Sequence, residues 1–168
     1  MNNLIIEKVN IEAIPLIQEL TMMVWPQTYS SVLSAEQITY MLDQMYSNES
    51  LTQQMQTGQQ FVIAYFNNQP IGFASYGETE QSNEFKLYKL YIITTVQKTG
   101  AGKYLLWYVM DEIKKAGVNH LILQVNRQNE NAISFYKRMG FKVEQQANFD
   151  IGSGYFMNDY VMGISLTN

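Results

Sequence analysis

The sequence contains no cysteine, and this absence excludes several kinds of chemistry at once. A chain without thiols has no disulfide, no thiolate zinc site and no cysteine nucleophile. The single histidine, His120, directly precedes an apolar stretch, and we interpret it as structural. We therefore expect no bound metal.

Long apolar runs are absent as well. No run reaches the roughly 18 apolar residues of a membrane-spanning helix, and no basic segment followed by an apolar one opens the chain. We therefore expect no membrane partner and a cytoplasmic location. With 168 residues, 46% of them hydrophobic, the chain can bury a substantial core, and we expect residues 1–168 to form a single domain.

Positive charge is scarce, since 11 Lys and Arg stand against 15 Asp and Glu and the net charge is −4. A nucleic-acid-binding protein normally has a basic balance and a wide basic stripe, so we expect no nucleic acid partner. An acidic balance favours a cationic acceptor, although net charge alone is weak evidence about a substrate.

One glycine-containing segment is informative. Residues Gln97–Lys103 follow a strand-like run, Phe85–Ile92, and open a helix-like one. The first turn of a helix has unpaired N–H groups that suit a phosphate anion. Gly100 and Gly102 would let the backbone approach that anion closely. The simpler alternative is a strand-to-helix turn without a ligand.

Two better-known phosphate motifs do not fit this segment. A P-loop ending at Gly102-Lys103 requires glycine at the position of Gln97 and Ser or Thr at the position of Tyr104. A dinucleotide-binding fingerprint requires glycine at the position of Leu105. The segment therefore indicates a different anion-binding loop.

Downstream, a continuous apolar run predicts a buried strand over His120–Val125, which ends at the polar Asn126. The next segment, Asn129–Met139, predicts a helix closed by Gly140. One face of this helix carries Ala132, Phe135, Tyr136 and Met139. Tyr136 is then either a core aromatic residue or a hydroxyl at the edge of a pocket.

Together these segments resemble the GCN5-related N-acetyltransferase (GNAT) family. Gln97–Gly102 is similar to its Gln/Arg-x-x-Gly-x-Gly/Ala pyrophosphate loop, and Asn131–Phe141 is similar to its second conserved block. The resemblance implies an N-acetyltransferase with acetyl-CoA as co-substrate.

The resemblance also implies roles for single residues. The strand before the loop would hold the pantetheine arm, and the loop would hold the pyrophosphate. Tyr136 would be the catalytic acid that protonates the departing thiolate. The cofactor-binding residues expected on this basis are Leu90, Tyr91, Ile92, Gln97, Lys98, Thr99, Gly100, Ala101, Gly102, Lys103, Asn126 and Asn131.

A looser resemblance concerns the N-terminal third. Residues 24–29 and 33–42 resemble the acceptor-binding region of bacterial spermidine/spermine-type acetyltransferases, and residues 159–162 have a similar character. This implies a small-molecule amine acceptor, with a polyamine as the sharpest interpretation. The residues expected to bind the acceptor are Trp25, Tyr29 and Asp159.

The group that takes the proton from the amine is not evident. Relatives often carry glutamates at the positions that align with Lys86 and Tyr88, so those carboxylates are missing here. Ordered water is the alternative route for the proton.

The sequence predicts an α/β (α+β) fold of GNAT type, with a mixed, mostly antiparallel, twisted sheet of about seven strands and helices on both faces. Strands are expected at Leu4–Val9, Phe61–Phe66, Ile71–Gly77, Phe85–Ile92, His120–Val125, Phe141–Gln145 and Tyr160–Leu166. Helices are expected at Ala13–Val24, from the Ser34 cap to Met45, at Ala101–Ala116 and at Asn129–Met139. Pro26 is expected to stop the first helix.

Three functions remain open on the sequence. The favoured one is acetyl transfer to a small-molecule amine, by a monomer or homodimer. The second keeps the enzyme but makes the acceptor a protein or peptide amine. The third is a non-catalytic acetyl-CoA-binding module, which the missing strand carboxylates favour.

Overall fold

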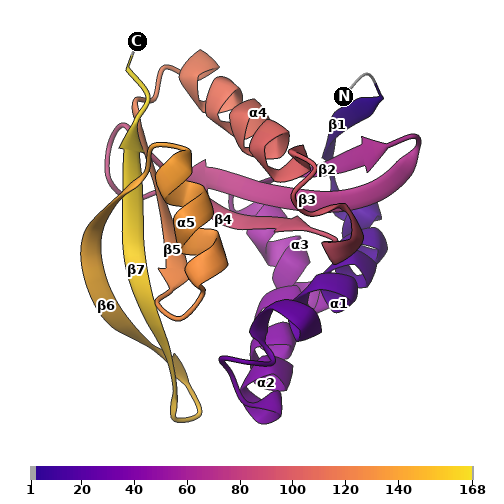
Figure 1. Ribbon diagram of the computed structural model, residues 1–168, viewed down its shortest axis with the longest axis vertical. Helices are drawn as coiled ribbons and strands as arrows, with labels where there is room; N and C mark the ends of the chain where they lie inside the picture. Colours follow the sequence, from indigo (N-terminus) through magenta and orange to yellow (C-terminus); the bar gives the residue numbers. More distant parts are fainter. Residues whose placement is uncertain (1–2, 168) are drawn as a thin grey trace. The chain divides into compact units, whose positions relative to one another are not determined.

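The computed structural model describes residues 3–167 of the chain (Figure 1). The chain divides into two compact units. Unit 1 comprises Met1–Gly77 and Lys89–Val109, and unit 2 comprises Glu78–Tyr88 and Met110–Asn168.

Seven strands form one hydrogen-bonded sheet in the order β1-β2-β3-β4-β5-β7-β6. The strands are β1 (Leu4–Val9), β2 (Gln60–Phe66), β3 (Gln69–Glu78), β4 (Glu84–Ile92), β5 (His120–Asn126), β6 (Lys142–Gly152) and β7 (Tyr155–Ser165). β4 and β5 pair in parallel, whereas β1–β2, β2–β3, β5–β7 and β6–β7 are antiparallel. The predicted mixed, mostly antiparallel sheet is confirmed.

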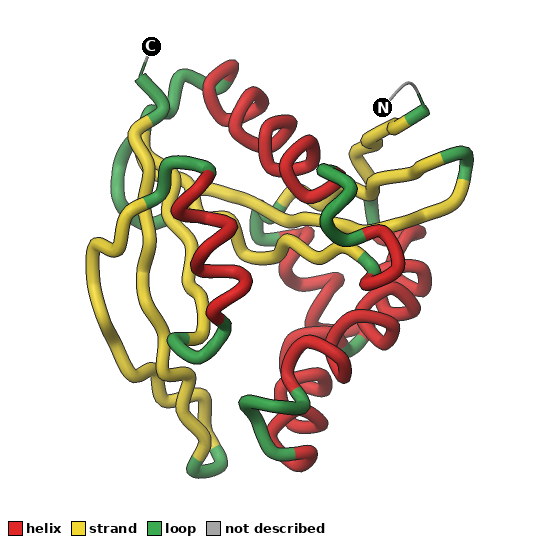
Figure 2. The backbone as a smooth tube through the Cα atoms, in the orientation of Figure 1, coloured by secondary structure: helices red, strands yellow, loops and turns green. Residues whose placement is uncertain are grey.

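Three helices lie between β1 and β2 along the chain, one lies between β4 and β5, and one lies between β5 and β6; Figure 2 shows them in red. They are α1 (Ile14–Tyr29), α2 (Ala35–Tyr46), α3 (Asn48–Gln56), α4 (Ala101–Lys115) and α5 (Glu130–Arg138), with short 3₁₀ turns η1 (Ile11–Ala13) and η2 (Thr94–Val96). Within unit 1, helices α1, α2 and α3 lie on one side of strands β2 and β3, and the start of α4 lies on the other (Figure 1). β4 and α4 each begin in one unit and end in the other.

Several helix ends agree with the cap chemistry of the sequence. The Ser34 hydroxyl accepts a hydrogen bond from the Gln37 N–H at 3.1 Å, and the Asn129 side chain accepts one from the Ala132 N–H at 3.2 Å. Gly140 has a φ of +97°, the left-handed conformation that ends many helices. The expected starts of α2 and α5 are therefore confirmed to within one residue.

The prediction that Pro26 stops α1 is wrong, because the helix continues to Tyr29. A proline removes only one backbone hydrogen bond, and this loss falls in the last turn of the helix. The Thr28 hydroxyl donates to the Val24 carbonyl at 2.9 Å. The rings of Trp25 and Tyr29 pack with centroids 4.6 Å apart. These contacts in the last turn offset the missing bond.

Helix α3 and the full lengths of β6 and β7 escaped the sequence analysis. α3 buries only Leu51, so it has no apolar stripe to reveal it. β6 and β7 contain 11 residues each and form a long hairpin, whereas the sequence predicted only Phe141–Gln145 and Tyr160–Leu166. In the second half of β6, half-buried Ala147, Phe149 and Ile151 alternate with exposed neighbours, so a strand signal was present there and the predicted strand ended too early.

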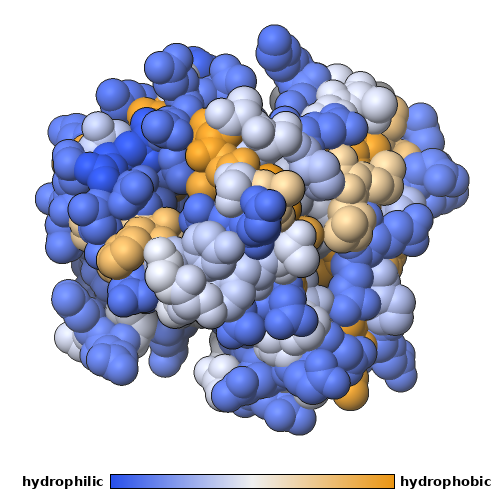
Figure 3. Space-filling view, turned by 90° about the horizontal axis from the view of Figure 1, so that it is seen from below, coloured by the Kyte–Doolittle hydropathy of each residue, from blue (hydrophilic) through white to orange (hydrophobic). Residues whose placement is uncertain are grey.

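Each unit has its own apolar core. Fully buried side chains in unit 1 include Ile17, Leu20, Phe61, Phe73 and Leu105, and those in unit 2 include Leu121, Leu123 and Met162. Burying a side chain of this size contributes about 1.5–3 kcal/mol. The face in Figure 3 is mostly polar, with apolar side chains in small separate groups. Within residues 3–167, no helix combines the length and apolar character needed to cross a bilayer.

In unit 1, Gly72 on β3 lies close to the backbone of β4. A Cβ at this position would be 2.3 Å from the Tyr91 carbonyl oxygen and 2.5 Å from the Cδ1 atom of Ile92. The carbonyl oxygen is held by the strand and cannot move aside as a flexible side chain can. Glycine is therefore required here by close approach.

We predict that Gly72→Ala destabilises the protein by about 1–3 kcal/mol, the usual cost of inserting a carbon into a packed site. Thermal unfolding should show a fall in Tm of several degrees. Gly154→Ala is the control, because a Cβ at Gly154 meets nothing within 4 Å and only its φ of +78° opposes the change. A Tm for Gly72→Ala equal to that of the wild type would contradict the close approach.

Candidate functional site

The glycine segment forms an exposed loop in unit 1 between η2 and α4. Lys98 has a φ of +65° and Gly100 a φ of +94°, so the chain turns twice through the left-handed region before the helix begins. The first helical hydrogen bond is donated by the Tyr104 N–H to the Gly100 carbonyl at 3.1 Å. This local geometry leaves the N–H groups of the first turn at the mouth of the loop.

Two side chains of the loop shape it from within. The Gln97 amide donates to the Ile92 carbonyl at 3.0 Å, which ties the loop to the end of β4. The Thr99 hydroxyl donates to the Val96 carbonyl at 2.6 Å. Because both side chains are engaged with the backbone, anion binding by this loop would depend mainly on oriented N–H groups and on the exposed Lys98 and Lys103.

Trp25 and Tyr29, two of the predicted acceptor-binding residues, belong to an aromatic cluster of unit 1. Trp25 lies 5.4 Å from Tyr46 and 6.1 Å from Tyr91 between ring centroids. Phe73 lies 5.6 Å from Tyr91. The hydroxyls of Tyr29 and Tyr91 are 3.1 Å apart. The cluster therefore links α1 and α2 to strands β3 and β4.

Within this cluster Trp25 is 2% exposed, so it is primarily a packing residue. Its indole N–H is buried without a well-formed hydrogen bond. Burial raises the pKa of the Tyr46 phenol far above its usual value, an effect that nearby Tyr29 strengthens and the neighbouring Trp25 and Tyr91 oppose. The Tyr46 hydroxyl therefore stays protonated. Tyr29 and Tyr91 are only half-buried and are the more accessible part of the cluster.

Sequence analysis missed Lys89, which is 8% exposed on β4 beside this cluster. Its ammonium donates to the Gln54 side chain at 2.8 Å and lies 5.2 Å from the centre of the Tyr46 ring. Gln54 belongs to α3, the helix that the sequence did not predict, so no pattern signalled this contact.

In unit 2, α5 carries Asn131 and Tyr136. Asn131 is exposed in the first turn of the helix. Tyr136 is 8% exposed, and its ring packs against those of Phe135 and Phe141 at 5.2 and 5.6 Å between centroids. Contacts with these neighbouring aromatic rings fix the position of the Tyr136 ring.

Asn126 and Asp159 face each other at the end of the β5–β7 ladder. The Asn126 side chain accepts a hydrogen bond from the Gln128 N–H at 2.9 Å, which shapes the turn into α5. The structure therefore places Asn126, a predicted cofactor-binding residue, directly beside Asp159, a predicted acceptor-binding residue.

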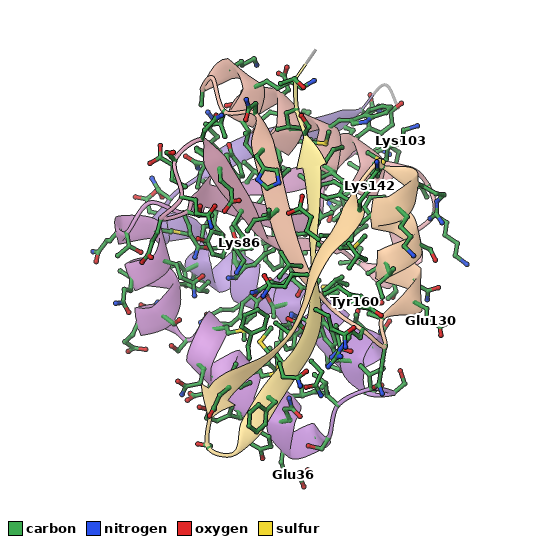
Figure 4. The ribbon with its side chains drawn as sticks, turned by 90° about the vertical axis from the view of Figure 1, so that its left-hand side faces the viewer. Glu36, Lys86, Lys103, Glu130, Lys142 and Tyr160 are labelled. Atoms are coloured by element: carbon green, nitrogen blue, oxygen red, sulfur yellow. The ribbon has the colours of Figure 1, made fainter. Side chains whose placement is uncertain are left out.

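Asp159 is 1% exposed, and its Oδ2 has no hydrogen-bond partner. Burial raises the pKa of this carboxyl to about 6, against the opposing charges of Lys86 and Arg127. Burial also lowers the pKa of Lys86, whose ammonium donates to the Gln124 side chain at 2.9 Å. Figure 4 labels Lys86 on β4 and Tyr160, the neighbour of Asp159 on β7.

His120, which we interpreted as structural from the sequence, bridges two carboxylates of unit 2. Its Nδ1 lies 2.9 Å from Glu84 and its Nε2 lies 2.9 Å from Glu144. Burial alone would lower the pKa of His120, but the hydrogen bonds and charges of Glu144 and Glu84 raise it above its usual value. The described residues contain no group of three or more His, Cys, Asp or Glu side chains placed to hold a metal ion.

Sequence matches relate the chain to known proteins. The acetyltransferase (GNAT) domain family matches residues 29–154. The spermidine N(1)-acetyltransferase of Thermoplasma acidophilum is 31% identical over 150 residues, which cover 86% of this chain and 92% of that protein.

Solved structures agree with this match. The crystal structure of the PaiA N-acetyltransferase from Thermoplasma acidophilum, in complex with coenzyme A, has a TM-score of 0.81 at 28% identity and covers 96% of this chain and 98% of that one. The ribosomal-protein-S18-alanine N-acetyltransferase of Escherichia coli has a TM-score of 0.74 at 17% identity, with 98% and 95% covered. The second likeness shows a common fold alone.

We predict that Gly102→Glu weakens acetyl-CoA binding by roughly a hundredfold or more. The change places bulk and negative charge at the start of α4, and a hundredfold is about 2.7 kcal/mol, comparable to one or two lost charge-assisted hydrogen bonds. Isothermal titration calorimetry on folded protein measures the effect. Gln53→Glu adds the same charge at an exposed position of α3 and should bind acetyl-CoA like the wild type. Equal affinity in both variants would remove the loop from the binding site.

Proposed function

Because the chain belongs to the GNAT family of acetyltransferases, we propose that it transfers the acetyl group of acetyl-CoA to a primary amine of a small molecule, with a polyamine as the first candidate. The family match makes it an N-acetyltransferase that uses acetyl-CoA. The observation that carries the choice of a small amine is the 31% identity, over 86% of the chain, to a spermidine N(1)-acetyltransferase.

The proposed co-substrate site uses three groups of residues. Backbone groups of Leu90–Ile92 hold the pantetheine arm, the loop Gln97–Lys103 holds the pyrophosphate, and Asn126 and Asn131 make further contacts. The two left-handed turns of the loop support this assignment, because they present successive N–H groups at a helix start.

The residues proposed to bind the acceptor are Trp25 and Tyr29 in unit 1 and Asp159 in unit 2. Aromatic rings attract cations, and the half-buried Tyr29 offers both a ring face and a hydroxyl. Trp25 acts through the packing of Tyr29, since it is 2% exposed. The Asp159 carboxylate supplies the negative charge that an ammonium group seeks.

The reaction is a direct attack in a complex of both substrates. The amine nitrogen forms a bond to the thioester carbonyl carbon, the carbon–sulfur bond breaks, and the sulfur leaves with its electron pair. Tyr136 gives its phenolic proton to the sulfur and is then reprotonated from solvent. No covalent intermediate on the enzyme is needed.

An amine panel tests the substrate class. We predict that acetyl-CoA turnover is faster with spermidine, spermine or another small primary amine than with peptides bearing a free α-amine. Release of the coenzyme A thiol measures each rate. Faster turnover of a peptide would make the protein-directed alternative correct, and no turnover of any amine would overturn the proposed function.

We predict that Tyr136→Phe lowers kcat by roughly ten- to a thousandfold, because a positioned general acid typically contributes ~10²–10⁴-fold. The dissociation constant for acetyl-CoA should stay nearly constant, since the ring packing against Phe135 and Phe141 is kept. Tyr108→Phe, a half-buried tyrosine of α4, is the matched control and should retain kcat. Full activity in Tyr136→Phe would return Tyr136 to a purely structural role.

A further inference from the structure

Asp159 is the only carboxylate among residues 3–167 that is buried. A buried charge is costly to the fold unless it is paired, and its partners normally satisfy every oxygen. Here Oδ2 has no hydrogen-bond partner. A carboxylate kept in such surroundings retains a free lone pair, and groups of this kind concentrate at functional sites.

Two cations stabilise the negative charge of this carboxylate but do not donate a hydrogen bond to its Oδ2 atom. The charged groups that act on Asp159 are Lys86 on β4 and Arg127 in the turn after β5. Lys86 donates to the Gln124 side chain at 2.9 Å, and Arg127 donates to the Asn148 side chain. Both cations thus donate hydrogen bonds to neutral side chains, and their effect on Asp159 is electrostatic attraction between opposite charges.

The register of the sheet explains how these groups come together. Lys86 is paired with Ile122, and Asp159 is paired with Asn126. Alternation along β5 puts Ile122, Gln124 and Asn126 on one face. Lys86, Gln124 and Asp159 therefore share one face of the sheet in unit 2, opposite the face on which Leu121 and Leu123 are buried.

This face also lies at the end of the parallel ladder. The β4–β5 register ends at Leu87 and Leu123, while β5 runs on to Asn126 with β7 as its partner. Asp159 thus lies beside the part of β5 that is no longer paired with β4. This part is the carboxyl end of β5, after which the chain turns into α5.

We propose that Asp159 is the catalytic base that takes the proton from the acceptor ammonium, and that Lys86 is the positioning residue that keeps it ionised. This inference rests on the proposed amine acetylation. No residue of the loop or of α5 is proposed as the general base. In this proposal a carboxylate of β7 takes the amine proton, for which the sequence analysis suggested only ordered water.

The proton balance is complete. Asp159 removes one proton from the ammonium, and the freed nitrogen lone pair attacks the thioester carbon. The second proton lost by the nitrogen on forming the amide goes to solvent, while the sulfur receives a proton. Because Asp159 is 1% exposed, the ammonium either displaces part of its cover or hands the proton over through one water.

The pH dependence of kcat/KM tests the base directly. The wild type should lose activity below about pH 6, the pKa of the Asp159 carboxyl. Asp159→Asn should lose roughly 10²-fold or more at pH 7 and should lack this acid limb. Its deficit should shrink as the pH nears the ammonium pKa of about 10, where the amine is neutral without help.

The pH profile of Lys86→Met distinguishes an electrostatic role of Lys86 from a purely structural one. Removing a cation that lowers the Asp159 pKa should move the acid limb to higher pH. Activity at pH 7 should fall, and activity above the shifted limb should return toward the wild-type value. Asp111→Asn, the same chemical change at an exposed carboxylate of α4, should leave the profile unchanged.

The outcomes separate the two proposals. Each assay uses the fastest acceptor of the amine panel, whether a small amine or a peptide, since both need a base. Circular dichroism first confirms that each variant is folded, and Asp159→Glu, which keeps a carboxylate, should recover part of the lost rate. An acid limb that stays in folded Asp159→Asn, or that does not move in Lys86→Met, overturns the base while leaving acetyl transfer intact. No turnover of any acceptor overturns both.

Discussion

The short parallel ladder between β4 and β5 is the constraint on which the candidate site depends. It runs only from Glu84 and His120 to Leu87 and Leu123. Beyond this point β4 continues toward the glycine loop, and β5 continues beside β7 toward α5. A strand that leaves its neighbour must satisfy its backbone groups elsewhere, so the end of such a ladder is a natural place for a ligand.

Much of the fold could be predicted because its signals are local. The glycine at 140, the serine cap at 34 and the apolar run at 120–125 each fix a boundary through chemistry within a few residues. α3 could not be predicted because its nine residues bury only Leu51. Pro26 was misjudged because the aromatic contact between Trp25 and Tyr29 holds the last turn of α1.

Some parts of the candidate site could likewise be predicted from the sequence, and others could not. The loop around Gly100 and the helix face with Tyr136 could be identified from the sequence, since each is a contiguous motif. The environment of Asp159 could not, because Lys86 comes from β4 and Arg127 from the turn after β5, and only the pairing of the strands brings these segments beside β7. The depth at which Trp25 is buried was hidden for the same reason, since its ring neighbours Tyr29, Tyr46 and Tyr91 come from three elements.

The bridge that His120 makes between Glu84 and Glu144 has a consequence for how unit 2 responds to acid. A histidine whose folded pKa is raised contributes stability that is present in full below its unfolded pKa near 6.5 and is lost as the pH rises through the folded value. Asp159 acts in the same direction, since the folded state with a pKa of about 6 binds its proton more readily than the unfolded chain does at 3.8. Folding of unit 2 is therefore coupled to proton uptake between neutral pH and about pH 4, so mild acid favours the folded state at these two groups, whereas carboxylates with lowered pKa values would make a protein acid-labile.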